Sequence, residues 1–294
     1  DLFRYAQTPF SYRFFQAIPS MAATLGTGIT TVRDAGGADL GVKQAVIDGI
    51  VPGPRMQISL TLLGQTGGHS DDWMPSGAHM PLLPDYPGMP SSILDGPDEA
   101  RRKVREVLRA GADVIKVATS GGVLSPTDDP THAHFGLDEL ETIVAEAAIQ
   151  GRWVMAHAQA TEGIKNAVRA GIRSIEHGIF LDDEAISMML EAGTWLVPTQ
   201  VAPIGVVKAA EAGAGSPDAS VRKAREVIEV HRESFAAAVD AGVKIAMGTD
   251  SGVTPHGENL DELPLMAGGG MSPGEVLVAS TLGAAELMGW EDRV

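Results

Sequence analysis

The strongest constraint on the fold is the regular alternation of two kinds of segment along the chain. Short β-branched runs typical of strands lie at 29–34, 55–60, 113–119, 153–158, 173–177, 195–199 and 243–249. Stretches rich in Ala, Glu, Arg and Leu, typical of helices, lie near 13–26, 39–50, 97–111, 137–150, 161–171, 183–193, 217–241 and 272–288. Strands separated by helices pair in parallel, because each helix carries the chain back to the same end of the sheet. The sequence therefore predicts an α/β fold with a parallel sheet.

The domain organisation follows from the length and from the absence of a dividing linker. A chain of 294 residues is long enough for one large barrel. We therefore predict a single domain over residues 1–294. The first strand-like run follows a helix, so we expect an eighth strand upstream of residue 1. Segment 61–96 is rich in Pro, Gly and Met, and a loop of that length usually covers an active site or is mobile.

Composition argues against several classes of function. The chain has no cysteine, which rules out disulfides, thiolate zinc sites and a cysteine nucleophile, and fits a reducing, cytoplasmic location. Its net charge is −16 at pH 7, whereas nucleic acid binding needs a basic face. No apolar run reaches the roughly 20 residues that cross a bilayer. We expect neither nucleic acid nor a membrane as a partner.

Residues that can hold a metal end or follow four of the strand-like runs. They are Lys116, His157, His177 and Asp250. The carboxyl ends of the strands in a parallel barrel open onto one rim, so these side chains should converge. Imidazole suits Zn, Mn, Fe or Co, and a carboxylate can ligate a metal and accept a proton from water. A buried lysine shifts towards the neutral amine, which can react with CO2 to give a carbamate that bridges two cations.

Each of these residues also has a structural explanation when taken alone. Either histidine could be a buried or capping residue, Asp250 could cap a turn, and Lys116 could pair with a neighbouring carboxylate. His157 and His177 lie 20 positions apart, about one strand–helix–strand unit, so they should lie on adjacent strands. That placement favours a metal site.

The other histidines carry weaker signals. His69 follows a strand-like run and could polarise a substrate carbonyl or cap a turn. His132 and His134 form a His-x-His pair, but no strand fixes the loop that carries them. The histidines without supporting context are His79, His231 and His256. Neither a phosphate-binding glycine motif nor a Gly-x-Ser-x-Gly elbow is present.

Blocks along nearly the whole chain resemble the amidohydrolase superfamily, in particular its imidazolonepropionase-like and prolidase-like branch. The blocks are GITTVRDAGG (28–37), GQTGGHSD (64–71), GADVIKVATSGGVLSPTD (111–128), MAHAQATEGIKNAVRAGIRSIEHGIFLDDE (155–184), MGTDSG (247–252) and MSPGEVLVASTLGAAELMGWED (271–292). The resemblance implies a distorted (β/α)8 barrel of the TIM type with two divalent metal ions, usually zinc. It further implies a carboxylated Lys116 as bridge, His157 and His177 on the second metal, and Asp250 as ligand and proton shuttle.

The resemblance also marks two substrate-binding candidates and one absence. His69 matches a histidine that contacts the scissile carbonyl. Gln159 stands where members that cleave Xaa-Pro or N-acyl amino acids often carry Tyr. The family's other metal is held by a His-x-His on the first strand, and this chain lacks that strand and the flanking small β-sandwich. We therefore expect the sequence to be a fragment of a longer protein.

The expected function is that of a metal-dependent hydrolase, which cleaves an amide-type C–N bond in an N-acyl amino acid, a dipeptide or a related small amide. One alternative is a cyclic amidohydrolase or deaminase that acts on an imidazolone-like ring. Another is a non-catalytic barrel that binds a small molecule. Relatives often form homo-oligomers, and we expect the same here.

Overall fold

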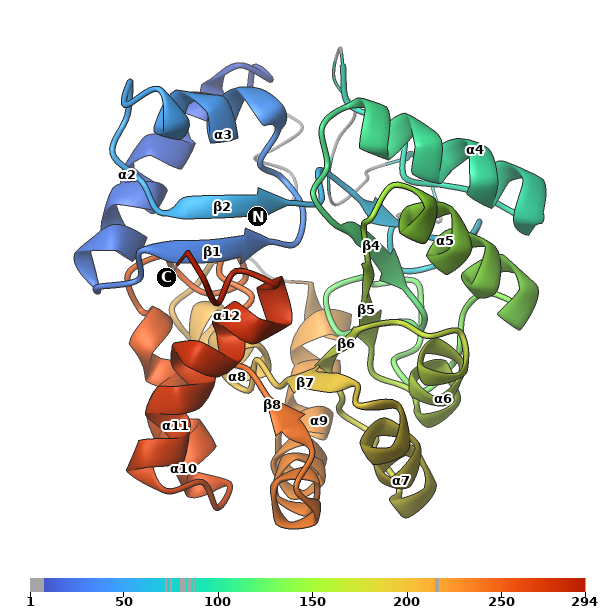
Figure 1. Cartoon of the computed structure of the whole chain (residues 1–294), viewed down its shortest axis with the longest axis vertical. Helices are drawn as coiled ribbons and strands as arrows, with labels where there is room; N and C mark the ends of the chain where they lie inside the picture. Colours follow the sequence, from blue (N-terminus) through green and yellow to red (C-terminus); the bar gives the residue numbers. More distant parts are fainter. Residues whose placement is uncertain are drawn as a thin grey trace.

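The strands form the inner wall of the molecule in the computed structural model, which describes residues 8–71, 73–74, 76–79, 83, 86, 88–214 and 217–293. Within these ranges the helices surround the strands (Figure 1). The strands are β1 (Thr31–Asp34), β2 (Arg55–Ile58), β3 (Leu62–Leu63), β4 (Ile115–Ala118), β5 (Val154–Ala158), β6 (Ser174–His177), β7 (Trp195–Val197) and β8 (Lys244–Ile245).

The helices alternate with these strands along most of the chain. They are α2 (Tyr12–Gly26), α3 (Leu40–Ile47), α4 (Gly96–Arg109), α5 (Leu137–Ile149), α6 (Thr161–Arg169), α7 (Asp183–Ala192), α8 (Val201–Glu211), α9 (Asp218–Ala241), α10 (Glu262–Gly268), α11 (Pro273–Ser280) and α12 (Leu282–Met288). A short 3-10 helix, η1 (Asn259–Asp261), precedes α10.

All strand pairs are parallel and join neighbours in sequence order. β1 pairs with β2, and β3 to β8 form a second sheet in the order β3-β4-β5-β6-β7-β8. The break between the two sheets falls at Leu60, whose φ of 67° turns the chain between β2 and β3. No pairing joins β1 to β8 in the described ranges. The prediction of a TIM-type barrel is confirmed. With β3, which the sequence analysis did not predict, the described residues already contain eight strands, and the further strand expected upstream of residue 1 stays a prediction.

The core forms where the helices lie against the central strands. In α4, Ala100, Val104 and Val107 are buried, a spacing of three and four residues that places them on one face. Every residue of β4, β5 and β6 is buried, as expected for parallel strands covered on both sides.

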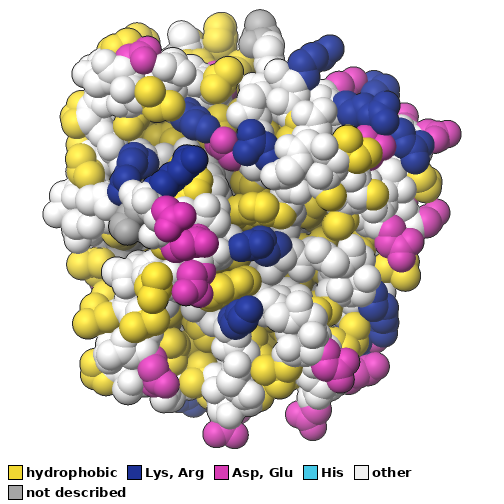
Figure 2. All heavy atoms as spheres, viewed as in Figure 1, with side chains coloured by type: hydrophobic (Ala, Val, Ile, Leu, Met, Phe, Trp, Pro, Cys, Tyr) yellow, Lys and Arg dark blue, Asp and Glu magenta, His cyan; other side chains and the backbone are white. Residues whose placement is uncertain are grey.

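On the face of the molecule drawn in Figure 2, acidic and basic side chains are interspersed with apolar ones. No helix of the described segments is long and apolar enough to cross a membrane.

Several elements differ from the sequence prediction. β3, α8 and α10 were not predicted, and the single helix expected at 272–288 is two helices that break at Thr281, with φ −127° and ψ −92°. The expected loop 61–96 contains β3 and, within its described residues, an isolated bridge between Gly64 and Ile93. Its residues 72, 75, 80–82, 84, 85 and 87 lie outside the described part of the chain.

The last helix is tied to strands far away in the sequence. The Gln57 side chain of β2 donates a hydrogen bond to the Met288 carbonyl at 2.8 Å. Arg173, directly before β6, donates to the Leu287 and Glu286 carbonyls, both at 2.8 Å. These carbonyls lie at the end of α12, where the regular helical N–H donors run out, so the two side chains supply donors there, although Glu286 also accepts from the Gly289 N–H at 3.1 Å.

Candidate metal and substrate site

The predicted ligands occupy neighbouring strand ends, as the sequence suggested. Lys116 lies on β4, His157 on β5 and His177 at the end of β6, while Asp250 follows β8. The rings of His157 and His177 are 4.7 Å apart between centroids and nearly perpendicular. The charge of Lys116 also acts on Asp250 and on His177, which places its amine near both side chains. The structure therefore brings the four residues together.

The hydrogen bonds of His157 and His177 determine which of their ring nitrogens stay available to ligate a metal. The Thr199 hydroxyl donates to the Pro198 carbonyl at 2.6 Å, so it accepts from Nδ1 of His177, also at 2.6 Å. Nε2 of His157 donates to the Gly121 carbonyl at 3.1 Å. Burial lowers the pKa of both rings well below the ordinary value, so both are neutral. Nε2 of His177 and Nδ1 of His157 therefore keep their lone pairs, as metal ligation requires.

Lys116 is a buried amine without a close partner. The residue is 5% exposed, and no hydrogen bond or ion pair to its side chain is found within the described residues. Burial lowers its pKa to about 8, although the charges of Glu176 and Asp250 act in the opposite direction. The amine is therefore much easier to deprotonate than an exposed lysine. This is the state that could form a carbamate.

Asp250 occupies a backbone conformation that few residues adopt. Its φ is 50°, in the left-handed region that Asp and Asn tolerate better than most residues. The hydroxyls of Thr249 and Ser251 lie 2.8 Å apart, and Asn259 donates to Ser251 at 2.8 Å, which fixes the turn. Burial of the carboxyl group raises the pKa of Asp250, although the residue as a whole is exposed.

His69 lies against the metal-ligand candidates. Its ring stacks on that of His157 with 4.2 Å between centroids and 14° between planes. Its Nδ1 is 2.7 Å from Oδ2 of Asp128. Gln159, the other substrate-binding candidate, donates its backbone N–H to Ser120 at 2.7 Å, and its side-chain Oε1 is buried without a partner among the described residues. Gln159 thus offers an unused acceptor.

The remaining histidines are not part of the cluster formed by the four predicted ligands. His134 is buried, packs against Gly68 and leaves its Nδ1 without a partner among the described residues. His132 belongs to the same loop, whose bridge at Ala133 pairs it with Ser120. The others are His79, which is 3.5 Å from Asp71, His256, which contacts Thr24, and His231, which donates to the His177 carbonyl. None of them joins the four predicted ligands.

Sequence reasoning missed the residues that hold His69 and His177 in place. Asp128, Lys223 and Thr199 have these roles, and their partners lie 22 to 95 positions away in the sequence. No local motif marks them. His, Asp and Glu side chains alone form no group of three that could hold a metal in the described segments. A metal held at this place by three or more side chains would therefore need Lys116 among its ligands.

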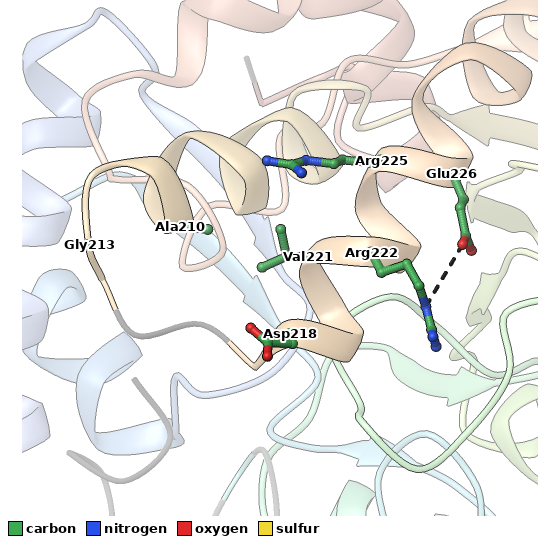
Figure 3. A pocket seen from close by; sticks show the side chains of 7 residues that line it. All are labelled: Ala210, Gly213, Asp218, Val221, Arg222, Arg225 and Glu226. Atoms are coloured by element: carbon green, nitrogen blue, oxygen red, sulfur yellow. Dashed lines mark ion pairs between the residues drawn. The ribbon is translucent and has the colours of Figure 1, made fainter.

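A separate hollow lies on the outside of the barrel between α8 and α9. Its volume is about 620 Å³, and an ion pair at 3.8 Å joins Arg222 and Glu226 at its edge (Figure 3). The other lining residues are Ala210, Gly213, Asp218, Val221 and Arg225. None of the predicted site residues lines this hollow.

The comparisons with known proteins agree with this geometry. Residues 17–294 match the model of the amidohydrolase family. The chain is 39% identical over 269 residues to ochratoxinase from Aspergillus niger, an alignment that covers 88% of this chain and 55% of that protein. The chain belongs to the amidohydrolase family. It spans about half the length of this curated relative.

Two solved structures are also similar to this one. A Xaa-Pro dipeptidase with methionine bound in its active site has a TM-score of 0.88 and 34% identity, and the match covers 98% of this chain and 72% of that chain. A prolidase complexed with N-methylphosphonate-L-proline has a TM-score of 0.90 and 37% identity, over 100% of this chain and 72% of that chain. The barrel is therefore shared with hydrolases of small amides.

Proposed function

We propose that this chain is the barrel of a metal-dependent hydrolase that cleaves an amide-type C–N bond in a small substrate. The observation that carries the proposal is the pair of neutral histidines, His157 and His177. Each has one ring nitrogen engaged in a hydrogen bond and the other free, and the charge of the unpaired Lys116 amine acts on both rings. Two imidazoles, an amine that can form a carbamate and a carboxylate suit divalent cations, with zinc as our first candidate.

The proposed ligands are His157, His177, Asp250 and the carbamate of Lys116. Bound cations would lower the pKa of a water molecule and polarise the scissile carbonyl. The protein's own part is to hold these donors. The Thr199 hydroxyl fixes the tautomer of His177, and the Gly121 carbonyl fixes that of His157.

Asp250 is the proposed proton carrier. Its carboxylate would accept the proton of the attacking water and return it to the leaving nitrogen. The raised pKa of Asp250, caused by burial, supports this role because a stronger base is better matched to proton transfer near neutral pH. His69 would contact the substrate carbonyl with Nε2, since its Nδ1 is already engaged by Asp128.

For the substrate, we propose an N-acyl amino acid or a dipeptide. The names of the similar proteins, ochratoxinase, Xaa-Pro dipeptidase and prolidase, support a small amide. Gln159 would contact the substrate through the side-chain Oε1 that is buried without a partner in the described part of the chain. A neutral amide there favours a polar, uncharged substrate group over a free carboxylate at this position.

The test uses the full-length protein. Metal analysis should find about two transition-metal ions per chain, and a panel of N-acyl amino acids and Xaa-Pro dipeptides should yield free amino acid. Ammonia or a ring-opened acid from an imidazolone would instead favour a cyclic amidohydrolase or a deaminase. Absence of both metal and turnover would favour a small-molecule-binding barrel.

A further inference from the structure

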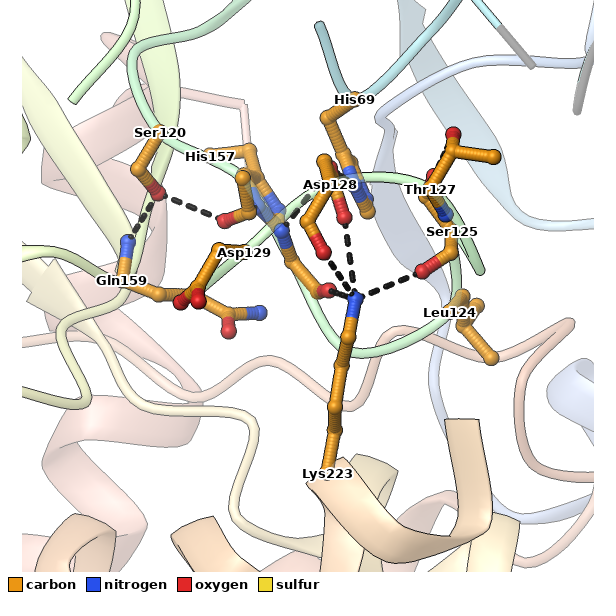
Figure 4. A network of polar contacts seen from close by, with 12 residues as sticks. His69, Ser120, Leu124, Ser125, Thr127, Asp128, Asp129, His157, Gln159 and Lys223 are labelled. Atoms are coloured by element: carbon orange, nitrogen blue, oxygen red, sulfur yellow. Dashed lines mark hydrogen bonds and ion pairs between the residues drawn. The ribbon is translucent and has the colours of Figure 1, made fainter. Parts of the chain in front are cut away.

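A lysine of α9 reaches into the loop that follows β4. The Lys223 side chain is 9% exposed. Its amine donates to the carbonyls of Gly122 at 3.0 Å and Ser125 at 2.7 Å, to the carbonyl of Asp128, and to Oδ1 of Asp128 at 3.2 Å (Figure 4). An ammonium group has only three N–H donors, so these four acceptors saturate it. Every acceptor belongs to loop 121–129.

This loop has no regular secondary structure of its own. Buried backbone carbonyls need donors, and here one cation supplies them for several carbonyls. A second contact comes from the same helix, because the Ser220 hydroxyl donates to the Leu124 carbonyl at 2.9 Å. The first turns of α9 therefore determine the path of the loop.

Asp128 connects Lys223 to His69. One carboxylate oxygen, Oδ1, accepts from Lys223, and the other, Oδ2, accepts from Nδ1 of His69 at 2.7 Å and from the Gly122 N–H at 3.1 Å. The side chain is 1% exposed. Burial alone would raise the pKa of Asp128, but the bond from His69 and the charge of Lys223 outweigh it, and the net shift is downward. Asp128 is therefore an anion, and hydrogen-bond donors hold both of its carboxylate oxygens in place.

The same loop confines the His69 ring from the side. A methyl group on Gly122 would lie 2.3 Å from Cε1 of His69 and 2.8 Å from Cε1 of His157, so the loop backbone contacts both rings. The bond to Asp128 and this close packing both favour the orientation of the His69 ring in which Nδ1 faces Asp128.

We propose that Lys223 is a positioning residue for His69. It acts through Asp128 and loop 121–129, and it holds the His69 ring in the orientation that presents Nε2 to the substrate. The inference rests on the proposed function for the role of His69 in catalysis, but the orientation of the ring is a property of the protein alone. Lys223 touches no proposed metal ligand and lies on a helix that contributes none of the predicted site residues.

The matched control is a second buried lysine. The Lys165 side chain on α6 is 6% exposed and bonds Asp182 at 2.8 Å and Glu184 at 2.6 Å, with no contact to loop 121–129. Lys165→Met thus removes an ammonium of similar side-chain exposure, but one that is paired with carboxylates and not with loop carbonyls. Any loss of stability or activity that comes only from removing a buried ammonium group should appear in both the Lys223 and the Lys165 variants.

The kinetic test is a double-mutant cycle in the full-length enzyme. Lys223→Met should lower kcat at least about tenfold with KM changed less, as expected when a contact made in the transition state is lost. In a His69→Asn background the same substitution should cost no more than about twofold, because two residues that act through one contact are not additive. Lys223→Arg should recover part of the rate, and Lys165→Met should stay near wild type. Equal losses in both backgrounds would overturn the proposal.

The second readout does not require turnover. Long-range 1H–15N spectra of histidine-labelled protein report ring tautomers, with the His69 signals assigned by their loss in His69→Asn. Lys223→Met should displace these signals, and Lys165→Met should leave them unchanged. If Lys223→Met does not fold, Lys223→Gln removes the charge and keeps an N–H donor, and the same displacement is expected. Unchanged His69 signals in the folded variant would refute the positioning role, even if no amide substrate were ever found.

Discussion

Nδ1 of His177 lies 2.6 Å from Oγ1 of Thr199, and both residues have a positive φ, 76° and 53°. Such backbone conformations are uncommon for β-branched and bulky residues, and they are retained where the surroundings over-determine them. Here each one turns the chain at the end of a strand or just after it, which places the ring and the hydroxyl opposite each other.

Thr199→Val should weaken metal binding without unfolding the protein. Valine has the same branched shape, so it tolerates the position as well as Thr does, but it leaves Nδ1 of His177 without an acceptor. Loss of such an outer partner typically costs about 10–100-fold in metal affinity. Competition with a chelating dye measures the change, and Thr199→Ser, which keeps the hydroxyl, should bind as tightly as wild type. Equal affinity in the valine variant would contradict the tautomer assignment.

Gly122→Ala should impair both catalysis and stability. The added methyl would lie 2.3 Å from Cε1 of His69, so the ring has to shift. A misplacement of about 1 Å can cost about 10²-fold in rate, whereas overpacking typically costs about 1–3 kcal/mol in stability. Steady-state kinetics and urea unfolding separate the two effects. Gly274→Ala is the control, because nothing lies within 4 Å of its Cβ position.

Asp250→Asn should abolish most of the turnover and leave the fold intact. Asn tolerates the left-handed backbone as Asp does, but it cannot carry the proton, and a general base typically contributes about 10²–10⁴-fold. The assay is hydrolysis at saturating metal, with metal content measured in parallel. Asp261→Asn, at an exposed position in the same connection, should behave as wild type. Near-normal rates for Asp250→Asn would exclude the proton-carrier role.

Glu262, which is not one of the proposed metal ligands, should make the stability of the protein depend on pH. Its carboxylate is fully buried and accepts from the N–H groups of Gln200 at 2.9 Å and Val201 at 2.8 Å, at the start of α8. Burial raises its pKa from 4.5 to about 8, against the effect of the two N–H groups. The unfolded chain therefore releases this proton at a lower pH than the folded chain does.

The free energy of unfolding should consequently fall as the pH rises from about 4.5 to about 8, and this contribution should be absent in Glu262→Gln. Urea unfolding at a series of pH values measures it as the difference between the two proteins. Parallel curves across that range would show that Glu262 is already ionised in the folded state at low pH.

The sequence predicted the elements with a strong pattern and missed those with a weak one. The buried strands were predicted because each is a continuous β-branched, apolar run, and the long helix α9 because its residues are typical of helices. Helix α8 was missed because Pro203 and Gly205 lie within it, although Pro203 falls in the first turn, where no N–H bond is lost. β3 is only two residues long and lies directly after the turn at Leu60.

The candidate site was predictable only where one residue carries its own signal. A histidine or a charged residue at the end of an apolar run is visible in the sequence, as for His157 and Lys116. Asp128 and Lys223 look like ordinary loop and helix residues. Their role depends on a contact across 95 positions, which exists only once α9 has packed beside the loop after β4.

The bonds from Gln57 and Arg173 to the end of α12 have a consequence for how the protein is made. The donors are synthesised 231 and 114 positions before the Met288 and Leu287 carbonyls that they reach. Until those residues leave the ribosome, the Gln57 amide lacks its acceptor. We therefore expect the barrel to reach its native packing only after α12 has emerged.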